Sequence, residues 1–397
     1  MLRFELKKHW LQKLNLVTLL VLLLLLLNTF LGLKTTSSTL ADAADNTLTS
    51  AYQKAYASVS KQRDDLDEVK PQTAAIKKRE AYLDAERQAL QPVVLASSSI
   101  YSNAGNATVN KARHKMIKAM LDYQTYTLRL AQKHDLQFAP ISRGGALGSQ
   151  KVAARKTDVR FYRYLLDHNL FEMALAKGNV PAANYLLNAF FSKLSPLMLL
   201  AFAALPAAAI LTFERRRGTA GFASVLPVQP VRPLLIRVLA ALIITLPLMA
   251  AALGLTYWLV GRTMGYGFWD YPLVTGSGQL ITAAHAVAWY AGLLAAAVVM
   301  LVMLATAVAQ LSASTGFVAV VCAGFVALTQ PAILTTAVLA PIARFLPQGA
   351  LRLDQVITGT TPWPAPTAAV AIVVLLAWAA VFLAAAVALS RRKQRVR

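Results

Sequence analysis

The sequence contains a single cysteine, Cys322, so no disulfide can form within the chain. Cys322 lies inside a long apolar run, where it has the surroundings of a packed side chain. Any part of the chain that faces outward must therefore fold without a disulfide, whatever the redox state of its compartment.

Charged residues are also scarce, at 15% of the 397 residues, against about a quarter in soluble domains. Hydrophobic residues make up 57%, and the mean hydropathy is +0.50. Such a chain needs membrane lipid as its solvent. The formal net charge of +22 would suit a nucleic-acid partner. However, Lys and Arg gather at the ends of the apolar runs, so we expect no nucleic acid.

Motifs for catalysis and nucleotide binding are missing as well. There is no HExxH, CxxC or Gly-x-Ser-x-Gly, and His114, His134 and His168 lie far apart. Gly144-Gly145 to Lys151 does not have the GxxxxGK[ST] spacing of a phosphate-binding loop. We therefore expect no enzyme activity, no catalytic residue and no metal or cofactor of its own in this chain.

Asp and Glu are absent from the cores of the apolar runs. Ion-coupled carriers bury ionisable residues there, and channels use charged rings or carbonyl filters. Neither class fits this sequence, so the energy for any transport must come from a partner.

Six apolar runs are present, and a bilayer core of about 30 Å needs about 20 residues. They lie at 15–33, 194–213, 234–260, within 280–311, at 316–340 and at 367–389. They predict an all-α integral membrane protein with six transmembrane helices. A cleaved signal peptide is the alternative for the first run, because Ala41-Asp42-Ala43 loosely resembles a cleavage site. That run is longer than the hydrophobic region of a signal peptide, which is usually about 7–15 residues.

Residues 1–13 carry four basic residues, and Leu2, Leu6, Trp10 and Leu14 recur every four positions. This spacing is typical of a helix that lies in the headgroup region. An ordinary basic flank is the alternative. On the first of these two interpretations, residues 1–33 form an interfacial helix and a first span.

Residues 34–193 form a polar segment with 23 Lys and Arg and 14 Asp and Glu. Apolar residues recur at helical spacing, and strand-like alternation is nearly absent, so we expect a mostly helical domain. Its apolar stripes indicate that the helices pack against one another. A ligand-binding surface is the alternative. Residues 194–397 then form the membrane domain with spans 2–6.

The loop after the third span contains Trp269 and Tyr271, which suit the membrane interface. With the N-terminus inside, the inside segments hold 14 Lys and Arg and the two short outside loops hold 3. This positive-inside bias places both termini in the cytoplasm and residues 34–193 outside.

The stretch 212–237 separates the second and third spans. It reads Glu214-x-x-x-Gly218-Thr219, then Leu226-Pro227, then Arg237 at the next span. Gly218 can end a helix and Thr219 can begin another.

Phe222, Val225 and Leu226 fall on one apolar edge of a two-turn helix, which Pro227 ends. Such an edge needs a protein groove or lipid. The three arginines at 215–217 mainly fix the orientation in the membrane.

This stretch resembles the permease subunits of type-2 ABC transporters, in which a Glu and a Gly-Thr precede a short coupling helix and a Leu-Pro. That family also has six spans, an amphipathic N-terminal helix and a re-entrant segment between spans five and six. The resemblance covers residues 1–33 and about 194–397; the polar domain is an insertion. Arg237 stands where the family often has Lys, which preserves the charge.

The resemblance implies an exporter of a lipid, peptide or drug-like substrate in a cell membrane, with a bacterial source. Two ATP-binding subunits would carry ATP and Mg²⁺ and would dock on the coupling residues. These residues are Glu214, Gly218, Thr219, Phe222, Val225, Leu226 and Pro227. A second six-span subunit, identical or related, would complete the path. The alternative is a membrane-anchored receptor or scaffold whose external domain binds a peptide, an envelope component or a phage.

Overall fold

The computed structural model describes residues 2–10, 12–34, 40–69, 71, 73–101, 106–170, 181–217, 231–364 and 366–395. The chain divides into two compact units. The apolar unit comprises Met1–Leu31, Pro181–Gly267 and Ala284–Arg397. The polar unit comprises Gly32–Val180 and Phe268–Ala283.

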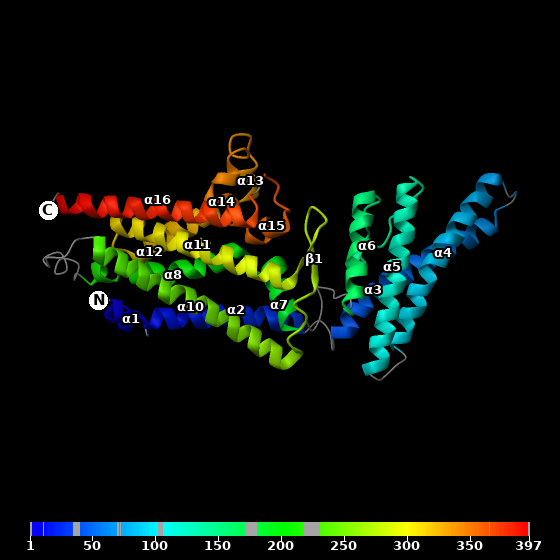
Figure 1. Ribbon diagram of the computed structural model, residues 1–397, viewed down its shortest axis with the longest axis horizontal. Coiled ribbons are helices and arrows are strands. Elements are labelled where there is room, and N and C mark those ends of the chain that lie inside the picture. The colour runs from blue at the N-terminus through cyan, green and yellow to red at the C-terminus, as the bar shows by residue number, and fades with distance from the viewer. Residues whose placement is uncertain are drawn as a thin grey trace. The chain divides into compact units, whose positions relative to one another are not determined.

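The apolar unit is built from helices that follow the predicted runs (Figure 1). They are α1 (Leu2–Trp10), α2 (Lys13–Lys34), α7 (Ala182–Asn188), η2 (Ala189–Lys193), α8 (Pro196–Arg216), α10 (Val231–Met264), α11 (Ala283–Leu311), α12 (Thr315–Ala327) and α16 (Ala368–Arg395). Pro196 occupies the first turn of α8, where its missing N–H leaves no hydrogen bond unmade.

By length and composition, α8, α10, α11 and α16 can each cross a membrane. The bent pair α1 and α2 would give a fifth span if taken together. The fold is thus all-α, with the apolar helices of a membrane protein. The count of six spans remains a prediction.

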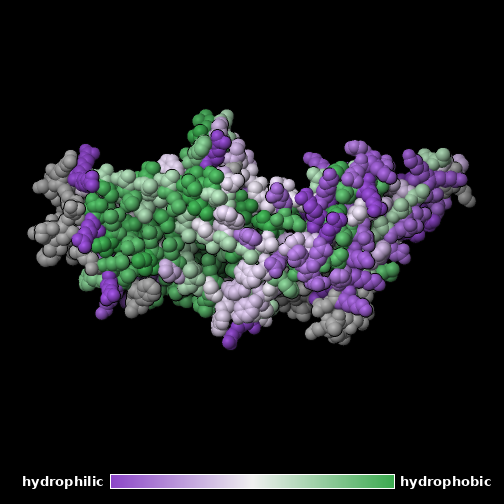
Figure 2. Space-filling view, viewed as in Figure 1, coloured by the Kyte–Doolittle hydropathy of each residue, from purple (hydrophilic) through white to green (hydrophobic). Residues whose placement is uncertain are grey.

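Helices α11 and α8 lie in the interior of the apolar unit. In their most apolar stretches 72% and 67% of the residues are buried, against 22% in α16. A helix that is apolar all round and buried belongs in a core. Val373 and Val381 of α16 are instead 65% and 55% exposed. Together with the continuous apolar surface of this unit (Figure 2), such residues present a face that suits lipid.

The fifth predicted span, 316–340, is not one continuous helix. Helix α12 spans 13 residues and ends at Ala327, a length of about 20 Å against the ~30 Å of a bilayer core. Pro331 causes the break, because it lacks an N–H and holds Gln330 in an extended conformation at ψ 135°. Helix α13 (Pro331–Leu334) starts at this proline.

The segment that follows folds back on itself in short helices. These are η3 (Ala343–Phe345), α14 (Pro347–Ala350) and α15 (Leu353–Thr358). Trp363, Leu334 and Ala343 form a buried cluster within the segment. Trp378 Nε1 donates a hydrogen bond of 2.9 Å to the Phe345 carbonyl. Since Trp378 lies ten residues, or about 15 Å, into α16, the segment reaches well along that apolar helix.

The described residues of the polar unit form four long helices, each packed on the next in sequence. They are α3 (Leu40–Asp67), α4 (Ala74–Tyr101), α5 (Asn106–Gln132) and α6 (Val152–Asp167). A short turn, η1 (Arg143–Gly145), lies in the loop between α5 and α6. The predicted helical character of residues 34–193 agrees with these elements. Residues 181–193, which the sequence grouped with the polar domain, belong to the apolar unit.

A small antiparallel hairpin also belongs to the polar unit, with β1 (Pro272–Val274) paired to β2 (Leu280–Thr282). The sequence suggested that Tyr271, just before β1, lies at a membrane interface. In the structure Tyr271 is 3% exposed, and its ring meets the edge of Phe161 of α6 at 6.3 Å. Tyr271 is thus a core residue of the polar unit.

A buried ion pair fixes the loop between α5 and α6. Arg155 Nη2 lies 2.8 Å from Asp158 Oδ2, and both side chains are at most 2% exposed. Asp158 also accepts hydrogen bonds from Ser142 and Arg143 of that loop. Because a buried charge is costly without partners, these contacts hold the loop in one conformation.

Glu86 of α4 lacks such compensation. Its side chain is 5% exposed, and among the described residues no hydrogen bond or ion pair reaches its carboxylate. Burial raises the pKa of Glu86 to about 7, and the positive charge of Arg79 only partly offsets this. Between pH 4.5 and about 7, the folded state therefore holds a proton that the unfolded chain releases.

The stability of the polar unit should consequently fall as the pH rises through that window. We expect Glu86→Gln to raise the free energy of unfolding relative to the wild type. This increase should be about 2 kcal/mol larger at pH 8 than at pH 5. Hydrogen exchange of α4 peptides in both proteins measures this difference. Asp65→Asn, which removes an exposed carboxylate on α3, should show no such pH dependence. An equal gain at both pH values would contradict the shifted pKa.

Candidate functional site

Of the predicted coupling residues, the structure describes Glu214. The other six, namely Gly218, Thr219, Phe222, Val225, Leu226 and Pro227, lie outside the described residues. Glu214 is in the last turn of α8, immediately before that stretch, and Arg237 is in the second turn of α10, just after it.

The Glu214 carboxylate joins three helices. Its Oε2 accepts a hydrogen bond from Arg237 Nη2 of α10, and its Oε1 lies 3.3 Å from Lys8 Nζ of α1. The three side chains are 15%, 22% and 20% exposed, so water screens these pairs only in part. One carboxylate thus connects the N-terminal helix to both ends that flank 218–230.

Phe213 adds an aromatic contact at the same place. His9 meets its ring edge-on at 5.0 Å, and Lys8 Nζ lies 4.6 Å from the ring centroid. The His9 side chain is also 3.2 Å from Glu5, and this hydrogen bond is the main reason that the pKa of Glu5 is lowered. We call the set Glu5, Lys8, His9, Phe213, Glu214 and Arg237 the Glu214 junction.

Helix α1 is set at 61° to α2, so the two do not form one straight helix. His9 stabilises the bend, because its carbonyl accepts a 2.8 Å hydrogen bond from Asn15 Nδ2. Its Nδ1 is also 2.6 Å from Gln12 Nε2. The amphipathic stripe of residues 1–13 thus forms a separate helix, which packs along α10.

Arg215 has a packing role that sequence reasoning missed. Its guanidinium donates to the Ala309 carbonyl, and Nη2 donates to Gln310 Oε1 at 2.7 Å. Ala309 is in the last turn of α11, where backbone carbonyls lack helical partners, so Arg215 caps that helix. The available signal was Gln310, a polar residue at the end of an apolar run.

A further contact joins the same helix end to α12. The hydroxyls of Thr212 and Thr315 are 2.7 Å apart. The last two turns of α8 are therefore bonded to α1, α10, α11 and α12. A displacement of this helix end would reach four other helices through short polar contacts.

The junction consists of ion pairs, hydrogen bonds and ring contacts. Within the described ranges, no group of three or more His, Cys, Asp or Glu side chains could hold a metal ion. These contacts can hold the helices together and can transmit a displacement from one helix to another.

Comparison of the chain with protein-family models, with curated proteins and with solved structures found no match.

Removal of the Glu214 charge should loosen α1. Glu214→Gln breaks both ion pairs, each worth on the order of 1 kcal/mol when partly buried. We expect roughly tenfold faster hydrogen exchange in the amides of Leu2–Trp10. Arg3→Gln is the matched control, because it changes one charge at an exposed position of the same helix. Equal exchange in wild type and Glu214→Gln would show that the junction does not hold α1.

Arg215→Lys separates the packing role from the orienting one. Lysine retains the positive charge that orients the protein. It lacks the planar guanidinium with which Arg215 donates to two acceptors at once. We expect unchanged topology and a loss of about 1–2 kcal/mol at the end of α11. Cysteine accessibility reports the topology, and hydrogen exchange in peptides over 300–315 reports the helix end. If the amides of 300–315 exchanged in Arg215→Lys as slowly as in the wild type, Arg215 would act only as a charge that orients the protein in the membrane.

Proposed function

We propose that this chain is the membrane-spanning permease subunit of a type-2 ABC transporter and that it exports its substrate. The observation that carries the proposal is the Glu214 junction. The glutamate of the coupling motif is bonded to both flanks of 218–230 and to the N-terminal helix. A partner that pushes on 218–230 would therefore move α8, α10 and α1 together.

In this proposal the six spans are α2, α8, α10, α11, α12 and α16. The 13-residue α12 is completed by the folded-back segment 331–364, which is the counterpart of the family's re-entrant segment. The bond from Trp378 to Phe345 supports this assignment, because it draws the segment alongside an apolar helix. The positive-inside bias supports cytoplasmic termini and an external polar unit.

The energy would come from two ATP-binding subunits that dock on Phe222, Val225 and Leu226, with ATP and Mg²⁺ held by those subunits. A second permease subunit, identical or related, would form the other half of the path. The absence of acidic residues from the apolar runs supports an external energy source over ion coupling. A lipid, a peptide or a drug-like molecule would suit a path lined by apolar residues.

The test is reconstitution of the purified chain in nanodiscs with a candidate ATP-binding subunit. We expect the chain to raise the rate of ATP hydrolysis, and Phe222→Ala and Glu214→Gln each to lower that stimulation at least tenfold. Phe222→Ala should also weaken copurification, because it removes the apolar anchor. Glu68→Gln, which removes an exposed carboxylate in the turn just after α3, is the matched control. Wild-type association and stimulation in both variants would refute coupling through this stretch.

A further inference from the structure

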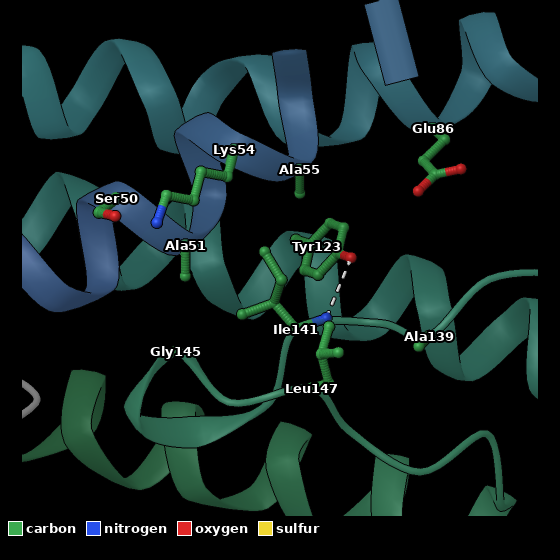
Figure 3. A pocket seen from close by; sticks show the side chains of 10 residues that line it. All are labelled: Ser50, Ala51, Lys54, Ala55, Glu86, Tyr123, Ala139, Ile141, Gly145 and Leu147. Atoms are coloured by element: carbon green, nitrogen blue, oxygen red, sulfur yellow. Dashed lines mark hydrogen bonds between the residues drawn. The ribbon is translucent and has the colours of Figure 1, made fainter. Parts of the chain in front are cut away.

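The polar unit contains a cavity of about 620 Å³. Its walls come from α3, α4, α5 and the loop that follows α5, as Figure 3 shows. Ligand sites commonly have volumes of 300–1,000 Å³, with mostly apolar walls and a few polar groups. Ala51, Ala55, Ile141 and Leu147 supply apolar wall here, and Glu86 supplies a carboxylate.

The cavity exists because small side chains face a loop that is held away from them. Ala51 and Ala55 lie one helical turn apart on α3, and both point into the space (Figure 3). The loop is fixed by a 2.7 Å hydrogen bond from Gln124 Nε2 to the Ile141 carbonyl. The Ile141 amide donates to the Tyr123 hydroxyl at 3.4 Å. The space is thus preformed.

Glu86 lines this cavity, and no hydrogen bond or ion pair from the described residues reaches its carboxylate. Arg79, one possible partner on α4, donates its hydrogen bond to Gln137 instead, at 2.8 Å. An ionised carboxylate that is buried and unpaired carries a large desolvation cost. A ligand that supplied a positive charge would remove this cost, so the cavity has a built-in preference for cations.

Lys54 limits which cations fit. Its exposed amine lies at the rim, and Figure 3 shows Lys54 and Glu86 on either side of the Tyr123 ring. A second positive charge at the outer end of a ligand would be repelled. Leu147, 79% exposed, offers apolar surface to the same cavity. A single cationic group attached to an apolar body satisfies all of these residues.

We propose that this cavity binds a monovalent organic cation, with a protonated amine beside Glu86 and an apolar body against Tyr123, Ala55 and Leu147. This inference concerns the polar unit alone and does not depend on the proposed transport function. For residues 34–193 the sequence predicted helix packing or a ligand surface of unknown kind. The structure adds the chemical class of the ligand, an amine.

Tryptamine is a suitable probe, and 3-ethylindole is its uncharged counterpart of similar shape. Both are titrated by calorimetry into the full chain in nanodiscs, with empty nanodiscs subtracted. At pH 8 we expect tryptamine to bind at least tenfold more tightly than 3-ethylindole. Glu86→Gln should remove that difference and leave 3-ethylindole unchanged. Asp65→Asn should bind both as the wild type does.

The pH adds an independent readout. The groups that face Glu86 are Arg79 and Tyr82 of α4, Tyr123 and Tyr126 of α5, and Lys54 of α3. Burial raises the pKa of each of these three tyrosines, so none ionises near neutral pH. Glu86 therefore dominates the titration, and tryptamine should bind about tenfold more weakly at pH 6 than at pH 8.

Ala55→Phe tests the position of the site, because the larger ring occupies the cavity. We expect it to abolish binding of both probes while the protein stays folded, as judged by its circular dichroism. Three results would each overturn the proposal: no binding of tryptamine to the wild type, equal tryptamine affinity in Glu86→Gln, or full binding in a folded Ala55→Phe. The ATPase readouts of the transport proposal are unaffected by any of them.

Discussion

The apolar unit depends on the ion pairs of Glu214 with Lys8 and Arg237, which join the ends of α8, α1 and α10. Lipid or partner helices can stabilise apolar helices along their length, but the helix ends need specific polar contacts. Glu214 provides such contacts for α1 and α10. Arg215, the next residue, provides them for α11. Two adjacent side chains of α8 thus hold the ends of three other helices, α1, α10 and α11.

The polar unit contains two buried carboxylates in opposite situations. In the polar unit, Asp158 is surrounded by Arg155, Arg143 and Ser142, and the result is a rigid loop. Glu86, about 5% exposed in the same unit, has no such partner among the described residues and faces a cavity. Satisfied buried charges stabilise one conformation, whereas an unsatisfied one indicates a site that a ligand can complete.

Much of the fold could be predicted from the sequence, because apolar runs and their charged flanks act locally. The positions of α8, α10, α11 and α16 followed from hydropathy alone. The fifth run was misread past Ala327, since hydropathy does not register that Pro331 lacks an N–H. Tyr271 was assigned to an interface because an aromatic residue near an apolar run has the same local pattern in a core.

The sequence by itself determined the apolar helices typical of a membrane protein and the helical character of the polar unit. These depend on composition and on spacing within a few turns. Only the tertiary structure decided what each charge contacts. Lys8 and Glu214 are 206 positions apart, and Arg215 and Gln310 are 95 apart. Charge pairing depends on distances of a few ångströms between side chains, and such distances are set only when the helices pack.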